Sequence, residues 1–274
     1  MKDYEKTGYL NCNFKLFHIK DKSSKSYDFH YHEFHKVIFF LEGDVFYQIE
    51  GQSYRLKPQD IVIVPAGTVH RPVIESGKTY ERIILYVSTE FLEDASALSA
   101  CFRTVREKKS HVLRLGSLSF QSKLWKNVLE LENSFQDTDY ANEFYRDALF
   151  RTFLVHLTRA VLNNTDELLH IETQNSKIAS VMEYLSEHLE EDITIDWLAS
   201  HFYISKFHLM HLFKEETGYT IYAYLNMKRL LKARALISSG TEAADACYLC
   251  GFRNYSTFFR AYKKYFAISP GQTR

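Results

Sequence analysis

Residues 1–95 alternate between short apolar runs and turn signals. Aromatic and β-branched residues fill 29–41, 45–49, 61–64 and 82–87, and runs of this length and alternation predict strands. The breaks between them carry turn-forming residues, namely Glu42-Gly43-Asp44, Glu50-Gly51-Gln52, Lys57-Pro58 and Ala66-Gly67. Many short strands at this spacing predict a sandwich or barrel of the jelly-roll kind.

Between residues 96 and 172 the apolar period changes to three and four, which predicts two amphipathic helices. The apolar positions are Leu124, Val128, Leu131 and Phe135 in one segment, and Leu149, Phe153, His156 and Ala160 in the next. Such helices either cap the barrel or pair with their copies in a second subunit. The polar breaks at 163–166 and 173–176 mark the expected linkers. The expected domains are therefore 1–95, 96–172 and 173–274.

The C-terminal domain carries one helical pattern twice. Leu209, Phe213 and Lys214 recur 49 residues later as Phe258, Tyr262 and Lys263, and each copy predicts a helix, a tight turn and a second helix. The joining segment, 222–237, has apolar residues on one side that can pack and cations on the other side that can face phosphate. These are Ala223, Leu225, Leu230, Leu231, Ala235 and Leu236, with Lys228, Arg229, Lys232 and Arg234.

A helix-turn-helix places its second helix in the major groove of DNA, and two joined units can enter successive grooves about 34 Å apart. The alternative is a pair of helical hairpins that serve only core packing. Charge favours DNA. Residues 201–274 hold eleven Lys and Arg against four Asp and Glu, a net charge of +7, and since the whole chain has 34 of each sign, residues 1–200 carry −7. A basic tail on an acidic body indicates that the tail meets a polyanion.

The tail resembles the AraC/XylS family of bacterial transcription regulators. The matching residues are Ala199, Ser205, Leu209, Phe213, Gly218, Arg229-Leu230, Gly251-Phe252, Ser256, Phe258, Arg260, Lys263 and Ser269-Pro270. The resemblance implies a ligand-responsive regulator with an α+β multidomain fold, namely an effector domain, a helical dimerisation region and a double helix-turn-helix. It implies promoter DNA as partner and a homodimer, with RNA polymerase as a further candidate partner.

Carried over by position, the resemblance assigns DNA contacts to both recognition helices. They are Lys206, Phe207, Met210 and His211 in the first, and Tyr255, Ser256, Thr257, Phe259 and Arg260 in the second. An arginine such as Arg260 can hold guanine O6 and N7 bidentately, and apolar groups can touch thymine methyls. For Phe207 and Phe259 the alternative is core packing. Ser205 is expected to be the N-cap of its helix.

The N-terminal domain is similar to the two cupin motifs, through His30-Tyr31-His32 before Glu42-Gly43 and through residues 65–70. In metal-bearing cupins two His, a Glu and a third His hold the ion. Here His30, His32 and His70 fill the histidine positions, but Lys36 replaces the Glu. An ammonium offers no lone pair and opposes a cation, so neither metal nor another cofactor is expected.

Strand alternation places His30, His32 and Lys36 on one face. We therefore expect these residues and His70 to bind an anionic effector, such as a sugar acid, a carboxylate or a phosphorylated sugar, because a buried cation needs a counter-charge. The alternative is that Lys36 reaches the rim or pairs with an acid such as Glu33 or Glu42.

Other classes of function lack their motifs. No phosphate-binding loop, nucleophile elbow or H-E-x-x-H occurs, so no enzyme is expected; the alternative is a cupin-type metal-dependent enzyme with an accessory DNA-binding tail. A third alternative is a tail that docks another protein. Neither a signal sequence nor a membrane span is found, and the four scattered Cys fit a reducing cytoplasm. Cys247 and Cys250 form a C-x-x-C without a second ligand pair.

Overall fold

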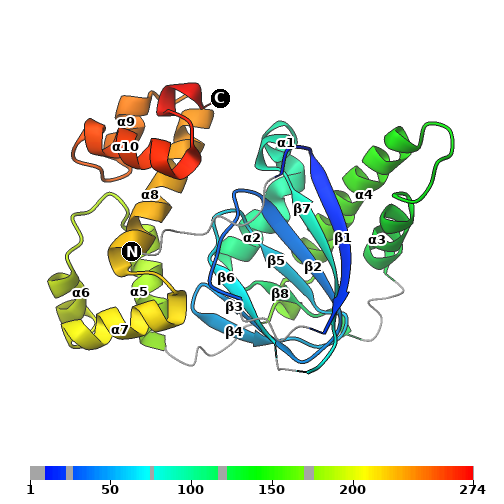
Figure 1. The fold of residues 1–274 in the computed structure, drawn as a ribbon, viewed down its shortest axis with the longest axis horizontal. Coiled ribbons are helices and arrows are strands. Elements are labelled where there is room, and N and C mark those ends of the chain that lie inside the picture. The colour runs from blue at the N-terminus through cyan, green and yellow to red at the C-terminus, as the bar shows by residue number, and fades with distance from the viewer. Residues whose placement is uncertain (1–9, 23–26, 75–76, 117–121, 170–175, 274) are drawn as a thin grey trace. The chain divides into compact units, whose positions relative to one another are not determined.

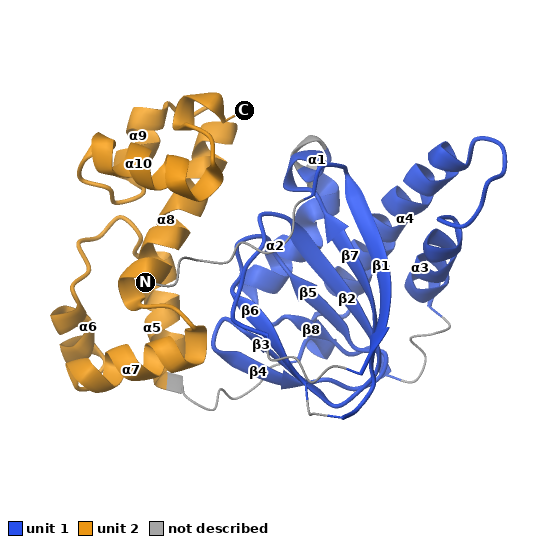
Figure 2. Ribbon diagram, viewed as in Figure 1, with its two compact units in different colours: residues 1–172 blue, residues 173–274 orange. Residues whose placement is uncertain are grey.

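The computed structural model of the protein describes residues 10–22, 27–74, 77–116, 122–169 and 176–273. The chain divides into two compact units, Met1–Glu172 and Thr173–Arg274, called unit 1 and unit 2 (Figure 2). Unit 1 contains the β-sheets and unit 2 is helical, which is the predicted α+β arrangement. None of the described helices is both long enough and apolar enough to cross a bilayer.

Two antiparallel sheets form the body of unit 1 (Figure 1). The strands are β1 (Phe14–Asp21), β2 (His35–Glu42), β3 (Val45–Ile49), β4 (Gln52–Arg55), β5 (Ile61–Val64), β6 (His70–Ile74), β7 (Tyr80–Val87) and β8 (Val112–Leu113). One sheet has the order β1-β7-β2-β5-β8 and the other the order β4-β3-β6. Side chains from both sheets enclose one buried apolar cluster, so the sheets pack face to face as the jelly-roll prediction requires.

The central strand β2 is buried on both faces. Ile38 and Phe40 join the cluster between the sheets, whereas Val37 and Phe39 join a second cluster formed with the helices of unit 1. The Phe39 ring lies 5.0 Å from that of Trp125, measured between centroids. Burial on both faces explains why residues 37–41 form a continuous apolar run instead of an alternating one.

Helices cover the outer face of the five-stranded sheet (Figure 1). They are α1 (Thr89–Asp94), α2 (Ala100–Glu107), α3 (Lys123–Asn133) and α4 (Asn142–Asn163), with 3-10 turns η1 (Ser96–Ser99) and η3 (Thr165–Glu167). The predicted stripes of α3 and α4 are buried at Leu124, Val128, Leu149 and Phe153. Phe135 lies beyond the end of α3 and is 38% exposed, so it was wrongly placed in that helix. These helices share the core of unit 1; a distinct region at 96–172 stays a prediction.

The strand predictions succeeded where apolar runs lie between turns, as at Val45–Ile49 and Ile61–Val64. The predicted run 29–41 was too long, because β2 begins at His35 and only an isolated bridge joins His30 to His70. Strands β1, β4, β6 and β8 were missed. β1 alternates poorly because much of it is exposed, and β6 contains Pro72.

Unit 2 consists of two helical groups joined by the long helix α8 (Figure 1). Its elements are α5 (Ser176–Glu187), α6 (Ile195–His201), α7 (Lys206–Thr217), α8 (Ile221–Ser238), α9 (Ala243–Leu249), α10 (Tyr255–Phe266) and the 3-10 turn η4 (Pro270–Gln272). Thr194, Ser205, Thr220 and Asn254 cap α6, α7, α8 and α10, each accepting from a backbone N–H three residues on. Two helix-turn-helix units, α6–α7 and α9–α10, therefore stand on either side of α8, as the repeat predicted.

Candidate functional site

Helix α7 is fixed at its N-terminus and along one face. The Ser205 hydroxyl accepts a hydrogen bond from the backbone N–H of His208, which confirms Ser205 as the N-cap. Leu209 and Phe213, four residues apart, are fully buried. Because these two side chains hold the inner face of α7, the residues at the other positions of its first turns project away from the core.

The predicted contact residues of α7 lie on or beside this outer face. Phe207 is 81% exposed, so the alternative that it packs in the core is wrong. Lys206 forms an ion pair with Asp196 of α6 at 2.8 Å. His211 is exposed and Met210 is partly buried. The N-terminal half of α7 therefore presents a cation, an imidazole and two apolar side chains together.

Helix α10 repeats the arrangement. Asn254 caps it by accepting from the backbone N–H of Thr257 at 3.0 Å, and Phe258 and Tyr262 are fully buried. Phe259 is 36% exposed and lies outside the buried cluster around Phe258, so core packing is wrong for it as well. The predicted contact residues, all exposed, are Tyr255, Ser256, Thr257, Phe259 and Arg260.

The four cations of α8 contact protein groups; whether they also face phosphate stays a prediction. Arg229 is partly buried and donates two hydrogen bonds of 2.6 Å to the backbone carbonyls of Leu189 and Glu191. The other three are Lys228 over the Tyr224 ring, Lys232 at 3.4 Å from Glu190 and Arg234 over the Phe266 ring. A helical period shows which residues share a face but not what packs against that face.

The two cysteines of the C-x-x-C pair are core residues of the second helix-turn-helix. Cys247 and Cys250 are free thiols with no exposed surface. Burial raises the pKa of the Cys250 thiol to about 11, so it is a poor thiolate donor at neutral pH. Within the described part of the chain, neither belongs to a group of three or more metal-ligating residues.

In unit 1, three histidines meet at one end of the space between the sheets. His30 and His70 pair through both backbone N–H groups, and their ring centroids lie 4.4 Å apart. His32 lies 5.0 Å from His30 and 5.1 Å from His70 by the same measure. His35 faces the other way and stacks on Phe102 at 4.0 Å. The structure therefore brings together the three predicted histidines, from segments 40 residues apart.

Lys36 is buried beside these histidines. Its side chain is only 7% exposed, which contradicts the alternative that it reaches the rim. It has no hydrogen bond or ion pair to any residue that the structure describes, and Glu42 pairs instead with Lys20. Burial, and then the charge of Arg82, lower the pKa of Lys36 to about 7. An ammonium held away from water in this way is stabilised by a negative group brought next to it.

His30 and His70 are neutral and present lone pairs. Burial and then the charge of Lys36 lower the pKa of His30 to about 4 and that of His70 well below its ordinary value. His30 Nδ1 lies 2.9 Å from the Asp28 carbonyl, and His70 Nδ1 lies 2.9 Å from the Thr68 carbonyl. Since a carbonyl only accepts, each Nδ1 carries the proton and each Nε2 is an acceptor.

A divalent metal does not fit this set of residues. The three histidines could supply ligand atoms within 4.8 Å of one another. The fourth position of the cupin pattern is Lys36, however, whose charge already lowers the histidine pKa values and opposes a second cation. Lys36 offers a donor where a carboxylate would offer a ligand atom. The cluster is therefore suited to an organic molecule that carries an anionic group and hydroxyl donors.

Two further residues of this interior were not found from the sequence. Tyr47 of β3 is 1% exposed, stacks on His70 at 5.9 Å, and its hydroxyl has no hydrogen-bond partner among the described residues. The alternation within 45–49 does place Tyr47 on one face with Val45 and Ile49 and is the signal that was available. Arg82 is 5% exposed and pairs with Asp21 at 2.8 Å, and no sequence signal distinguished it from its strand neighbours.

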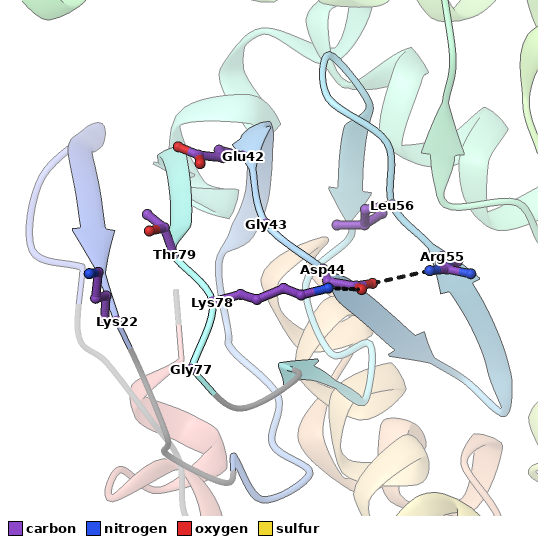
Figure 3. Close-up of a pocket in the computed structure, with 9 residues that line it drawn as sticks. All are labelled: Lys22, Glu42, Gly43, Asp44, Arg55, Leu56, Gly77, Lys78 and Thr79. Carbon is purple, nitrogen blue, oxygen red and sulfur yellow. Dashed lines mark hydrogen bonds and ion pairs between the residues drawn. The ribbon is translucent and has the colours of Figure 1, made fainter.

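A surface depression of unit 1 is a separate feature. It has a volume of about 550 Å³ and is lined by Lys22, Glu42, Gly43, Asp44, Arg55, Leu56, Gly77, Lys78 and Thr79 (Figure 3). Asp44 pairs there with Lys78 at 2.6 Å and with Arg55 at 3.5 Å. None of the predicted effector residues lines it. Because Lys78 and Arg55 are already paired and solvated, it is a weaker candidate than the buried cluster.

Family models match both halves of the chain. Residues 198–274 match a helix-turn-helix domain, and residues 16–122 match the AraC-like ligand binding domain. The chain belongs to the AraC family. It is a ligand-binding, DNA-binding transcription regulator, and the resemblance seen in the sequence is confirmed. The alternative of a cupin-type enzyme finds no support, since the AraC-type relatives are regulators.

Curated relatives and one solved structure match most of the chain, and another solved structure matches about a third of it. The activator RhaS of Enterobacter sp. (strain 638) is 25% identical over 249 residues, covering 89% of this chain and 86% of the relative. RhaS of Escherichia coli (strain SMS-3-5 / SECEC) is 23% identical over 253 residues, with the same coverage. Among solved structures, ToxT from Vibrio cholerae covers 95% of this AraC-family chain and 97% of its own at 14% identity and a TM-score of 0.37. A probable AraC family regulator from Rhodopseudomonas palustris covers 36% and 94% at 29% identity and a TM-score of 0.34.

Proposed function

We propose that α7 and α10 read two successive major grooves of promoter DNA through the exposed side chains near their N-termini. Arg260 is the residue suited to bidentate contact with guanine, and Phe207 and Met210 to contact with thymine methyls. The remaining proposed contacts are Lys206, His211, Tyr255, Ser256, Thr257 and Phe259. The exposure of Phe207 and Phe259 supports the assignment, since neither is needed by the core.

The first experiment is selection of genomic fragments by the purified protein. We expect enrichment of duplexes with two half-sites about one helical turn apart. Footprinting of the selected duplex by wild type and by Arg260→Ala then assigns one half-site to α10. A protein that retains no genomic duplex at low ionic strength, with or without metabolites, contradicts the proposal.

We further propose that unit 1 binds an anionic, hydroxylated small molecule between its sheets, with Lys36 holding the anionic group. The observation that carries this proposal is the burial of Lys36 without an ion pair among the described residues. The Nε2 atoms of His30 and His70 would accept from ligand hydroxyls, with His32 beside them. Sugar acids, hydroxycarboxylates and phosphorylated sugars have this chemistry, and a neutral sugar lacks the charge.

Thermal unfolding with matched ligand pairs tests the effector class. Gluconate against glucose, and a sugar phosphate against its parent sugar, differ mainly in charge. A ligand at a hundredfold excess over its Kd stabilises the folded state by about 2.7 kcal/mol, or roughly 5–10 °C in Tm for a unit of this size. We expect stabilisation by members of the anionic series only.

Two lysine variants complete the test of the effector. Lys36→Met should lose the response to anions, whereas Lys20→Met, which removes an exposed lysine paired with Glu81, should keep it. Stabilisation by neutral sugars alone, with an unaltered response in Lys36→Met, would show that the effector is not anionic. Stoichiometric iron, manganese or zinc in the purified protein would instead point to the histidines as metal ligands.

We infer that the protein acts as a homodimer in the cytoplasm, where its DNA partner lies, and that it activates transcription as its RhaS relatives do, with RNA polymerase as its partner at the promoter. Effector binding would shift the population between arrangements in which the two subunits can or cannot bind the promoter at the same time. Effector and DNA would then change each other's affinity by the same factor. Titration of labelled promoter DNA at several effector concentrations measures that factor in both directions.

A further inference from the structure

The segment between α5 and α6 touches the second helix-turn-helix unit as well as the first. Its residues Leu189 and Ile193 are buried within unit 2, and it leads directly into α6. Arg229 of α8 donates from Nε to the Leu189 carbonyl and from Nη2 to the Glu191 carbonyl, each at 2.6 Å. A guanidinium that binds two carbonyls of one segment fixes both its position and its orientation.

Gly251, in the turn between α9 and α10, completes the contact from the other side. Its φ is +81°, and a Cβ there would lie 2.3 Å from the Leu189 carbonyl oxygen, 2.9 Å from Glu190 Cα and 3.0 Å from Arg229 Cζ. The first two are backbone atoms, which cannot move aside as a flexible side chain does. Glycine is therefore required by the close approach as well as by the φ angle.

We call residues 189–191, Arg229 and Gly251 the bracket. Exposed ion pairs lie around it, between Arg253 and Asp192 and between Lys232 and Glu190. Exposed pairs of this kind contribute little. The bidentate hydrogen bonds and the glycine contact are the specific part of the bracket, because they are directional and partly buried.

The bracket is a second connection between the two helix-turn-helix units. The first is α8, which enters α5–α7 through Tyr224 and α9–α10 through Leu230 and Ala233. A single helix of this length can still curve gently, which changes the angle between its two ends. The bracket restricts this change. If α5 and α6 turned about α8, residues 189–191 would lose their contacts with Arg229 and Gly251.

We propose that the bracket sets the spacing and the helical phase of the two DNA half-sites that the protein accepts. Arg229 and Gly251 are thus positioning residues for base recognition, although neither lies in a recognition helix. The proposal rests on the proposed reading of DNA by both α7 and α10. Two linked modules gain affinity only when both can bind at once, so the distance and rotation between α7 and α10 decide which operators are bound tightly.

Duplexes of graded spacing test the proposal. They derive from the site that wild type selects and carry the matched spacing, insertions of one and two base pairs, or a single half-site. Arg229→Gln is compared with Lys228→Gln, which removes the same charge from the adjacent position of α8 without touching the bracket. Wild type and Lys228→Gln should bind the matched duplex about 100-fold more tightly than the single half-site.

For Arg229→Gln, the ratio of matched to shifted affinity should fall about tenfold, while affinity for the single half-site stays within about twofold of wild type. Circular dichroism on heating shows that the variant is folded. Should Arg229→Gln fail to fold, Arg229→Lys serves in its place, because it keeps the charge and loses the two-point contact; its ratio should fall as well.

An unchanged spacing ratio in a folded Arg229→Gln, or in Arg229→Lys where that variant replaces it, overturns the proposal. An equal loss on every duplex, the single half-site included, also overturns it, since it would show damage to one recognition helix instead of a changed spacing. Failure of wild type to bind any duplex refutes the proposed DNA function, which is a different result and is seen before any variant is made.

Discussion

The two units place their polar chemistry in opposite positions. In unit 1 the side chains Lys36, Arg82 and His70 are buried, whereas in unit 2 the proposed contact residues His211 and Arg260 stand in solvent. A small molecule can be surrounded, so its recognition gains from groups held away from water. A duplex cannot be surrounded, so the residues that read it must project. The difference predicts that the two binding events respond to different variables.

Ionic strength should separate the two sites most strongly. DNA binding with six to ten phosphate contacts should weaken by about 10³- to 10⁵-fold between 50 and 200 mM salt. Effector binding at the buried Lys36 should change far less over this range, because buried charges are screened weakly. Fluorescence anisotropy of labelled duplex and calorimetry of the effector measure the two slopes. Equal salt dependence of the two affinities would contradict the contrast between a buried and an exposed site. A DNA affinity that does not change with salt would favour the alternative that the tail docks another protein.

Two phenylalanines of unit 2 sharpen the comparison between buried and exposed residues. Phe258→Ala should lower the free energy of unfolding by about 3–5 kcal/mol, because a buried ring is replaced by a cavity. Phe207→Ala should change it by less than about 0.5 kcal/mol and weaken DNA binding instead. Denaturant unfolding and DNA titration on both variants check this. A large loss of stability in Phe207→Ala would show that Phe207 packs in the core.

Replacing Arg260 tests whether one side chain recognises one DNA base pair. Arg260→Ala should cost about 1–3 kcal/mol of affinity for the selected site and relax specificity at one base pair. Lys264→Ala, which removes an exposed cation from the last turn of the same helix, is the control and should weaken binding to all sequences evenly, because a cation attracts phosphate whatever the base sequence. Competition between duplexes that differ at one base pair distinguishes the two. An equal loss of affinity for all duplexes in Arg260→Ala would indicate that Arg260 contacts phosphate instead of a base.

The pH response belongs to unit 1. The folded pKa of Lys36 is about 7 against an ordinary value of 10.5, so the unfolded chain binds more protons between these values. Stability without effector should therefore rise with pH across that window. Affinity for an anion should do the reverse, falling by up to about tenfold per unit above pH 7, because the ammonium is lost. Calorimetry from pH 6 to 9 checks this, and Lys36→Met should show neither trend.

Much of the fold followed from local pattern. The period of Leu209 and Phe213 and its repetition at Phe258 and Tyr262 predicted both helix-turn-helix units, because buried residues on a helix recur every three or four positions. Strand β1 was missed for the opposite reason. It is an edge strand with much of its surface exposed, so its residues carry little alternation.

Only those site residues that lie in the same short segment of the sequence could be predicted to lie together. Alternation and motif placed Lys36 beside His30 and His32, and the structure brings them together. Tyr47 and Arg82 enter the same interior from other strands, and no spacing in the sequence relates them to Lys36. Arg229 shows the same limit, because its partners are backbone carbonyls 40 and 38 residues away.

Strand β2 separates the proposed ligand space from the helices of unit 1. Its alternate side chains face one or the other. A molecule pressing on Ile38 therefore displaces the backbone that also carries Phe39, whose ring contacts Trp125 and Phe153. Trp125 is completely shielded from solvent, and the chain's other indole, Trp197, is 43% exposed in unit 2. We therefore expect the fluorescence of Trp125 to change when the proposed ligand binds, with that of Trp197 as a reference.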